Sequence, residues 1–241
     1  MQVDKTTLND LSIFEREEEL SIFHYLCFTR TNQGKDYLRY LLSNPLGSIE
    51  AITDTQKTIQ HLQTSFAKWP ASITNGTIMV VEKFYDSPVI SYPNQPSIAN
   101  SFLYKLFNSY DFSLTKYSVE HFITFIKSME LLIEVLQQSQ SKQLQTWVSK
   151  IEFLLGKPFV KQMLQKDKKT KLLPSQILAF GNFLRNNYKH EVFELIDIYS
   201  KLDAYLSLAI ACTKYNFCFP QLQTSTQPFI TAQGLYHILL P

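Results

Sequence analysis

Two stretches of this chain contain residue types that could bind phosphate or a metal ion. The Gly-Lys pair at Gly156-Lys157 is a place to look for a P-loop, in which backbone N–H groups and a lysine cradle phosphates. A P-loop needs Ser or Thr after the lysine, but Pro158 follows it, and Ile151 stands where the first glycine belongs. His190-Glu191 begins like the helix of a zinc protease, which needs a second histidine where this chain has Glu194. We therefore assign no catalytic, cofactor-binding or metal site and expect His190-Glu191 to be an exposed charge pair.

A run of lysines is the one feature that could contact DNA directly. Six lysines fall within fifteen residues, from Lys157 to Lys171, and Asp167 is the only acid among them. Amines this close could neutralise phosphates and make binding depend on salt. The candidate contacts are Lys166, Lys168, Lys169 and Lys171. Charge runs are more often solvated loops between two helices, so both interpretations stay open.

Composition favours a folded chain without deciding its function. The 241 residues are 45% hydrophobic and include 18 Phe and 13 Tyr, enough for the core of one large domain or two small ones. The formal net charge of +2 neither indicates nor excludes a nucleic-acid binder. Three cysteines without a CxxC pair favour reduced thiols. The apolar stretch 204–212 is far shorter than the ~20 residues of a membrane span, so we expect a cytoplasmic protein with no membrane association.

Glycine and proline are absent from three long stretches, 48–69, 97–155 and 182–219, which favours uninterrupted helices there. Thr31 and Ser48 are predicted helix N-caps, and Ser48 would precede a helix with Ile49, Ile52, Ile59 and Leu62 on its buried side. Helix is also predicted to resume at Ser97.

Two further helices are predicted from apolar residues at intervals of three and four. From Ser118 onward, the stripe comprises Phe122, Phe125, Ile126, Met129, Leu132, Ile133 and Leu136. Between Tyr188 and Tyr215, the buried face comprises Val192, Leu195, Ile196, Tyr199, Leu202, Leu206 and Ala209. The stretch 219–230 should be loop or short strand.

Two sets of residues, one at each end of the chain, stand in an order that points to a known family. The first set comprises Asp4, Thr7, Leu11, Ser21-Ile22-Phe23, Thr29, Thr31, Gly34, Leu38-Arg39, Leu42, Pro45-Leu46, Ile49, Ile52 and Leu62. The second comprises Leu202-Asp203, Ser207-Leu208-Ala209, Tyr215-Asn216, Pro220, Phe229-Ile230, Gly234, Tyr236 and His237. The first resembles the opening of the core, or lever, domain of the MutS family of DNA mismatch repair ATPases. The second resembles the lever helix and the segment that leads from it into the ATPase.

The resemblance implies an all-α, multi-helix bundle of the MutS core or lever type with a long C-terminal lever helix. It implies a non-catalytic module that couples a downstream ATPase to DNA or partner contacts, in a parent that is a DNA-dependent ATPase. This chain would need no cofactor, whereas the parent's ATPase domain would bind ATP and Mg²⁺. The implied partners are DNA through the full-length parent, the chain's own ATPase domain, and a second copy through that domain.

The chain departs from the family at several points. Gln56 stands where members often carry Arg, and Ile238 stands where Pro commonly follows the histidine. Fewer than forty residues separate the lysine run from Leu202-Asp203, which leaves no room for a clamp domain. We expect a fragment without clamp, mismatch-binding or ATPase domains.

The predicted organisation is one helical domain. Its N-terminal part is 1–84, an irregular connection covers 85–96, the remaining helices lie within 97–218, and 219–241 is a linker toward the ATPase. The alternative function, from a different class, is a helical adaptor that binds protein partners and has no nucleotide motor.

Overall fold

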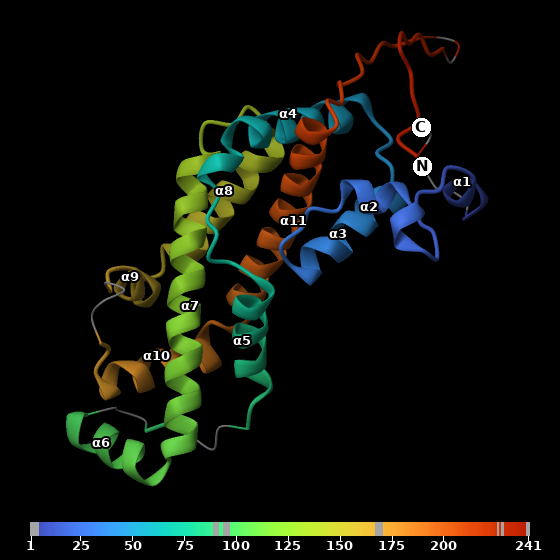
Figure 1. Ribbon diagram of the computed structural model, residues 1–241. Helices are drawn as coiled ribbons and strands as arrows, with labels where there is room; N and C mark the ends of the chain where they lie inside the picture. The colour runs from blue at the N-terminus through green and yellow to red at the C-terminus, as the bar shows by residue number, and fades with distance from the viewer. Residues whose placement is uncertain are drawn as a thin grey trace. The chain divides into compact units, whose positions relative to one another are not determined.

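The protein is all-α, as predicted. A computed structural model describes residues 5–88, 92–93, 97–166, 171–225, 227 and 229–239, and these residues form helices and no strand (Figure 1). The α-helices are α1 (Lys5–Asp10), α2 (Ile22–Leu26), α3 (Asn32–Ser43), α4 (Ile49–Ser65), α5 (Asn75–Asp86), α6 (Ile98–Phe107), α7 (Ser109–Leu136), α8 (Lys142–Leu155), α9 (Pro158–Leu164), α10 (Pro174–Asn187) and α11 (Lys189–Lys214). Within the described residues, no helix is long and apolar enough to cross a membrane.

The chain packs as two compact units. Unit 1 comprises Met1–Ala67, Ser139–Gln143 and Ser200–Pro241, and unit 2 comprises Lys68–Gln138 and Leu144–Tyr199. This grouping differs from the consecutive segments expected from the sequence, because α8 and α11 contribute residues to both units.

In unit 1, the helix starts predicted from the sequence are confirmed. The Thr31 side chain accepts a hydrogen bond from the Gly34 N–H, and the Ser48 side chain accepts one from the Ala51 N–H. The predicted buried side of α4 is confirmed at Ile59 and Leu62, whereas Ile49, its first residue, is exposed. A small core forms where Phe23, Leu38 and Ala204 pack together.

In unit 2, α7 is the central helix, and α5, α9 and α10 pack against it. The stripe predicted from Ser118 onward faces this core, since all of its members except the half-buried Ile133 are buried. The stretch 97–155, predicted to be helical because it lacks glycine and proline, forms the three helices α6, α7 and α8. The breaks fall at Asn108, whose φ is −123° and ψ 50°, and at 137–141.

A contact distant in sequence accounts for the second break. The Asp54 Oδ1 accepts a hydrogen bond from the Lys142 N–H (2.7 Å), and its Oδ2 accepts from the Gln143 N–H (2.9 Å) and the Ser141 hydroxyl (3.1 Å). A carboxylate on α4 thereby satisfies the first N–H groups of α8, which favours a new helix start there.

The long last helix is confirmed. Helix α11 runs from Lys189 to Lys214, and all seven residues of its predicted apolar face are buried. Asn216 follows in the left-handed region, with φ 54°, which suits the residue after a helix end. The described residues of 219–230 are neither helix nor strand. The predicted connection at 85–96 begins later than expected, since Tyr85 and Asp86 still belong to α5.

Candidate functional site: the buried helix junction at Asp203

A buried carboxylate on α11 holds the start of α3 within unit 1. Asp203 is 0% exposed, and the Arg30 N–H lies 3.0 Å from each of its oxygens. Its Oδ2 also accepts hydrogen bonds from the Thr31 N–H at 2.9 Å and from the Thr31 hydroxyl at 2.7 Å. All of these groups donate hydrogen bonds, so the position suits a side chain that can only accept them, such as a carboxylate.

The local sequence explains why these donors point at Asp203. Thr31 is the N-cap of α3, and its Oγ1 accepts a hydrogen bond from the Gly34 N–H (3.1 Å) while its own hydroxyl donates to Asp203. The N–H groups at a helix start lack intrahelical partners and carry partial positive charge. A carboxylate from a second helix therefore completes this helix start.

Gly34 allows the two helices to approach this closely. A Cβ at position 34 would lie 2.3 Å from Asp203 Oδ2 and 2.9 Å from Asp203 Cβ, closer than atoms can come. The glycine in the first stretch of the family resemblance is therefore explained by the aspartate in the second.

One turn further along α11, Ser207 holds the preceding backbone. Its Oγ accepts a hydrogen bond from the Phe28 N–H at 2.6 Å and donates to the Leu26 carbonyl at 2.5 Å. Asp203 and Ser207 are four residues apart and so lie on the same face of the helix. We refer to Leu26–Gly34 together with Asp203 and Ser207 as the Asp203 junction.

Burial has an electrostatic consequence at this junction. It raises the pKa of the Asp203 carboxyl above its usual 3.8, because desolvation outweighs the hydrogen bonds from Arg30 and Thr31, which favour the charged form. A carboxylate in this position accepts hydrogen bonds through both of its oxygens. An amide of the same shape could not, because its NH₂ group is a donor.

An ion-pair cluster holds the other side of α3. Glu18 accepts hydrogen bonds from Lys35 Nζ at 2.7 Å and from Arg39 Nη2 at 3.0 Å. The hydrogen bond from Lys35 holds the pKa of Glu18 below its usual 4.5. Arg39 also lies over the Phe23 ring, 4.4 Å from its centroid. The other acids of this segment, Glu15, Glu17 and Glu19, are exposed.

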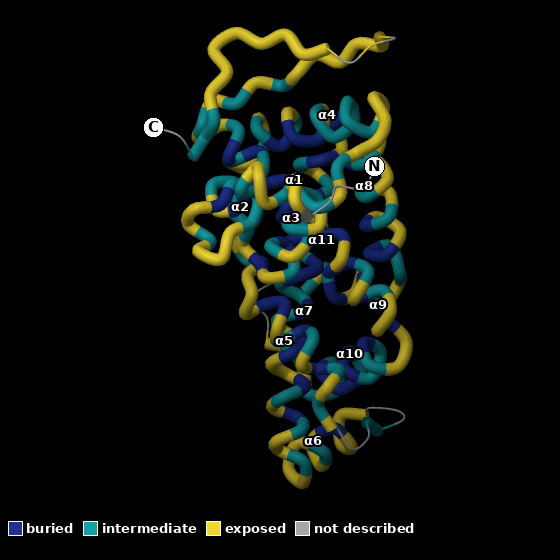
Figure 2. The backbone as a smooth tube through the Cα atoms, turned by 90° about the vertical axis from the view of Figure 1, so that its right-hand side faces the viewer, coloured by how far each residue is buried: buried dark blue, intermediate teal, exposed yellow. Residues whose placement is uncertain are grey.

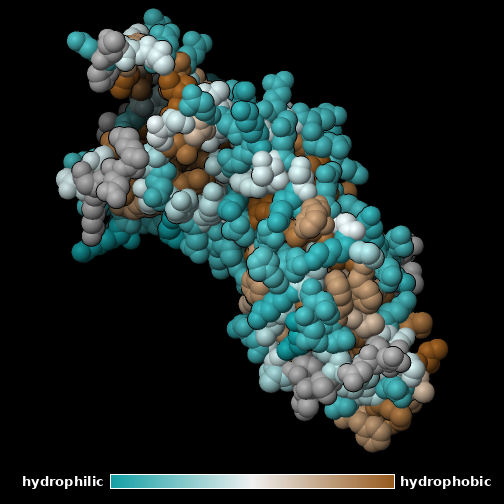
Figure 3. All heavy atoms as spheres, turned by 180° about the vertical axis from the view of Figure 1, so that it is seen from behind, coloured by the Kyte–Doolittle hydropathy of each residue, from teal (hydrophilic) through white to brown (hydrophobic). Residues whose placement is uncertain are grey.

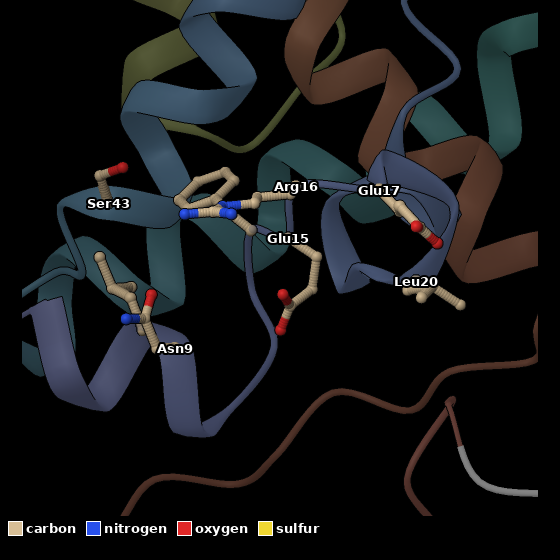
Figure 4. A pocket seen from close by; sticks show the side chains of 8 residues that line it. Asn9, Glu15, Arg16, Glu17, Leu20 and Ser43 are labelled. Carbon is tan, nitrogen blue, oxygen red and sulfur yellow. The ribbon is translucent and has the colours of Figure 1, made fainter.

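Beside this segment lies an open hollow of about 920 Å³ (Figure 4). Asn9, Glu15, Arg16 and Ser43 lie around it, together with the apolar Leu20. Its charged side chains do not converge on a common point in the close view, and we assign it no ligand.

The structure describes part of the lysine run. Lys168 and Lys169 lie outside the described residues. Lys171 is exposed, and Lys166 is half-buried just after α9, where its carbonyl accepts a hydrogen bond from Lys127 Nζ. Lys166 and Lys171 thus lie on either side of Lys168 and Lys169, and the hypothesis of DNA contact still depends on those two lysines.

The first lysine of the run serves packing instead. Lys157 forms an ion pair with Glu191 and lies 5.2 Å from the Tyr188 ring centroid. Burial acts to raise the pKa of Glu191, but its hydrogen bonds and the charge of Lys157 together lower it. The predicted exposed His190-Glu191 pair is therefore wrong in part, because Glu191 is only 20% exposed and its carboxylate binds Lys157.

The residues at Gly156-Lys157 do not fit ATP. The Gly156 N–H donates to the Glu152 carbonyl at 2.8 Å, the Lys157 ammonium pairs with Glu191, and Pro158 has no N–H. Phosphate cradling requires those N–H groups and that ammonium to be available. Among the described residues, no three His, Cys, Asp or Glu side chains are grouped so that they could hold a metal ion.

Comparison with known proteins assigns no family. No family model, no curated protein and no solved structure matches this chain.

The sequence analysis named Thr31, Gly34, Asp203 and Ser207 of the Asp203 junction without foreseeing their contacts, and it missed Leu26, Phe28 and Arg30. Thr31 and Gly34 belong to the first stretch of the resemblance, and Asp203 and Ser207 belong to the second. A further contact joins the same two parts of the chain at Gln56, a position that departs from the family, since its side chain donates to the Pro220 carbonyl at 3.0 Å. Both stretches contain small and polar residues, and this composition could have indicated that the two stretches pack closely against each other.

Proposed function

We propose that this chain is a non-catalytic lever module of a MutS-like DNA mismatch repair ATPase. The observation that carries the proposal is the Asp203 junction, where Thr31, from the first stretch of the resemblance, makes buried hydrogen bonds to Asp203, from the second. Thr31 and Asp203 are 172 residues apart in the sequence, and each belongs to a different stretch of the resemblance. Their contact favours a common structural origin for the two stretches.

The long helix gives the proposal a mechanical basis. Residues 189–199 of α11 belong to unit 2 and residues 200–214 belong to unit 1, so one helix runs through both. Coupling requires a stiff element with discrete packed arrangements. In this proposal α11 is that element, and the Asp203 junction fastens the N-terminal helices to it.

Exposed apolar residues after α11 support a further domain. Phe229 is 57% exposed, Ile230 93%, Leu235 85% and Tyr236 61%. Apolar side chains gathered on an irregular segment are typical of a surface that another domain covers. In the proposal this domain is the ATPase, which binds ATP and Mg²⁺ and through which the parent can dimerise and act on DNA. The free thiols Cys27, Cys212 and Cys218 are compatible with the reducing cytoplasm in which we place it.

The test is the reading frame beyond codon 241, followed by an assay of the complete protein. The proposal predicts a G-x-x-x-x-G-K-S/T motif in a strand-turn-helix and hydrolysis of ATP by the purified product. A stop codon directly after Pro241, or a continuation without that motif, would contradict the proposal and favour the helical adaptor.

A further inference from the structure

Helix α6 packs against the rest of unit 2 through the side that carries Ser101 and Tyr104. It contacts α7 and α10, and Ser101 is its only buried residue, followed by the half-buried Tyr104. The two lie three residues apart and so share one face. Among the described residues, neither the Ser101 hydroxyl nor the Tyr104 hydroxyl has a hydrogen-bond partner, although both oxygens are buried. The inward contact of α6 is narrow, because Tyr104 is its one residue that packs against the small cluster of Phe112, Ile177 and Leu178.

The apolar side of α6 faces outward. Ile98 is 80% exposed, Phe102 62%, Leu103 50%, Leu106 63% and Phe107 77%. At 100° per residue these side chains cover about half of the helix circumference. Tyr110, 79% exposed, extends the surface onto the start of α7. Figure 2 shows α6 largely exposed, and Figure 3 shows hydrophobic side chains gathered at its lower right, where α6 lies.

This arrangement inverts the usual rule for a surface helix, which buries its apolar stripe and exposes its polar face. The six side chains present on the order of 800 Å² of surface, more than the largest apolar patch of a typical monomer and about what one partner contributes to a standard interface. We refer to them as the α6 surface. Such a surface needs a partner.

The charge of the α6 surface narrows the choice of partner. Lys105 is the only charged residue between positions 97 and 110, and its Nζ lies 5.6 Å from the Phe112 ring centroid. A DNA contact or an anionic membrane would require several lysines or arginines. A surface rich in Phe, Tyr and Leu and poor in charge has instead the composition of a protein interface core.

We propose that the α6 surface binds a second copy of this chain. A two-fold axis would place the same apolar residues of both copies against each other, so the partner needs no complementary charge. The available area meets the requirement of a stable dimer without any additional element. This proposal is independent of the ATPase argument, because it concerns the 241-residue chain alone.

Sedimentation velocity over a concentration series of this chain tests the proposal. We expect a dimer with a dissociation constant on the order of micromolar or tighter. The variant Phe102→Glu with Leu106→Glu should weaken association by roughly a hundredfold or more, since it would bury four carboxylates in one apolar interface. The matched control is Phe153→Glu with Leu131→Glu, which changes an exposed Phe and an exposed Leu elsewhere in unit 2 and should leave the dimer intact.

Circular dichroism must show that the variants keep the helix content of the wild type. If the glutamate variant unfolds, the milder Phe102→Ser with Leu106→Ser replaces it, and at least a tenfold weakening is then expected. A wild-type chain that stays monomeric throughout the series would overturn the proposal. A dimer whose dissociation constant is the same in the wild type and in both α6 variants would also overturn it. A monomer that binds phosphatidylserine vesicles instead of a second copy would do the same.

Discussion

Single side chains decide how α3 meets α11. Asp203 is buried and accepts hydrogen bonds from Arg30 and Thr31, and Gly34 leaves room for it. Each of these residue types is required by its neighbours, since a donor in place of the carboxylate or a methyl group in place of the glycine hydrogen would create a clash. Substitutions at the Asp203 junction should therefore lower the free energy of unfolding by more than the same substitutions at exposed sites.

Gly34→Ala should destabilise the protein by about 2 kcal/mol or more, because the new methyl would overlap the Asp203 carboxylate. In an open helical site the same change is stabilising by about 0.5–1 kcal/mol. Gly76→Ala in α5 is the matched control, since its Cβ would lie 3.6 Å from the nearest atom, Thr74 Oγ1. Urea denaturation of both variants checks the prediction, and equal effects of the two changes would disprove it.

Asp203→Asn should lower the free energy of unfolding by roughly 2–3 kcal/mol, because an amide NH₂ would face the N–H groups of Arg30 or Thr31. Asp36→Asn, a change in a carboxylate that is 77% exposed, should stay within about 0.5 kcal/mol of the wild type. Chemical denaturation at pH 7 measures both. A loss at position 203 no larger than that at position 36 would mean that the hydrogen bonds contribute nothing to stability.

At the scale of helices, the sequence predicts what local rules control. The N-caps Thr31 and Ser48 and the stripes of α7 and α11 follow from residue type and from 3.6-residue periodicity. The break before α8 does not, because it depends on Asp54, which is almost ninety residues away. The outward orientation of the apolar side of α6 could not be predicted either, because an apolar stripe on a helix ordinarily indicates a core-facing side.

A test of helix packing in unit 2 concerns Tyr188. Its hydroxyl donates to the Leu154 carbonyl at 2.7 Å, and that carbonyl has no partner four residues ahead because position 158 is proline. Tyr188→Phe should therefore cost about 1–2 kcal/mol by leaving a buried carbonyl unpaired. Thermal and urea unfolding check this, with Tyr117→Phe, 52% exposed, as the control. Identical stabilities of the two variants would refute the assigned role of the hydroxyl.

At the scale of the molecule, the all-α class follows from the sequence, whereas the division into two units does not. Unit 1 contains residues from both ends of the chain and from 139–143. Contacts between such distant segments produce no periodic pattern in a short stretch of sequence. Only the resemblance pointed to residues of the candidate site, because buried polar residues such as Asp203 and Ser207 look like ordinary helix residues until their partners are known.

The lysine run gives a prediction for the whole chain. If it contacts phosphates, duplex DNA binding should weaken as salt rises, and Lys168→Glu with Lys169→Glu should reduce the slope of log K against log salt by about 2 while helicity is unchanged. Fluorescence anisotropy at several salt concentrations measures this. Lys57→Glu with Lys116→Glu, at two exposed lysines elsewhere, should leave the slope unaltered. A titration that is flat in salt would assign the run to a solvated loop.

The most direct test of the lever account is amide hydrogen exchange of the complete protein with and without a non-hydrolysable ATP analogue. The peptides to follow are 26–36 and 200–214, which contain the Asp203 junction and the unit 1 part of α11. A lever that passes movement along α11 predicts that nucleotide binding changes exchange in both peptides several-fold. Exchange that is identical in both peptides, in a protein that demonstrably binds the analogue, would contradict the account.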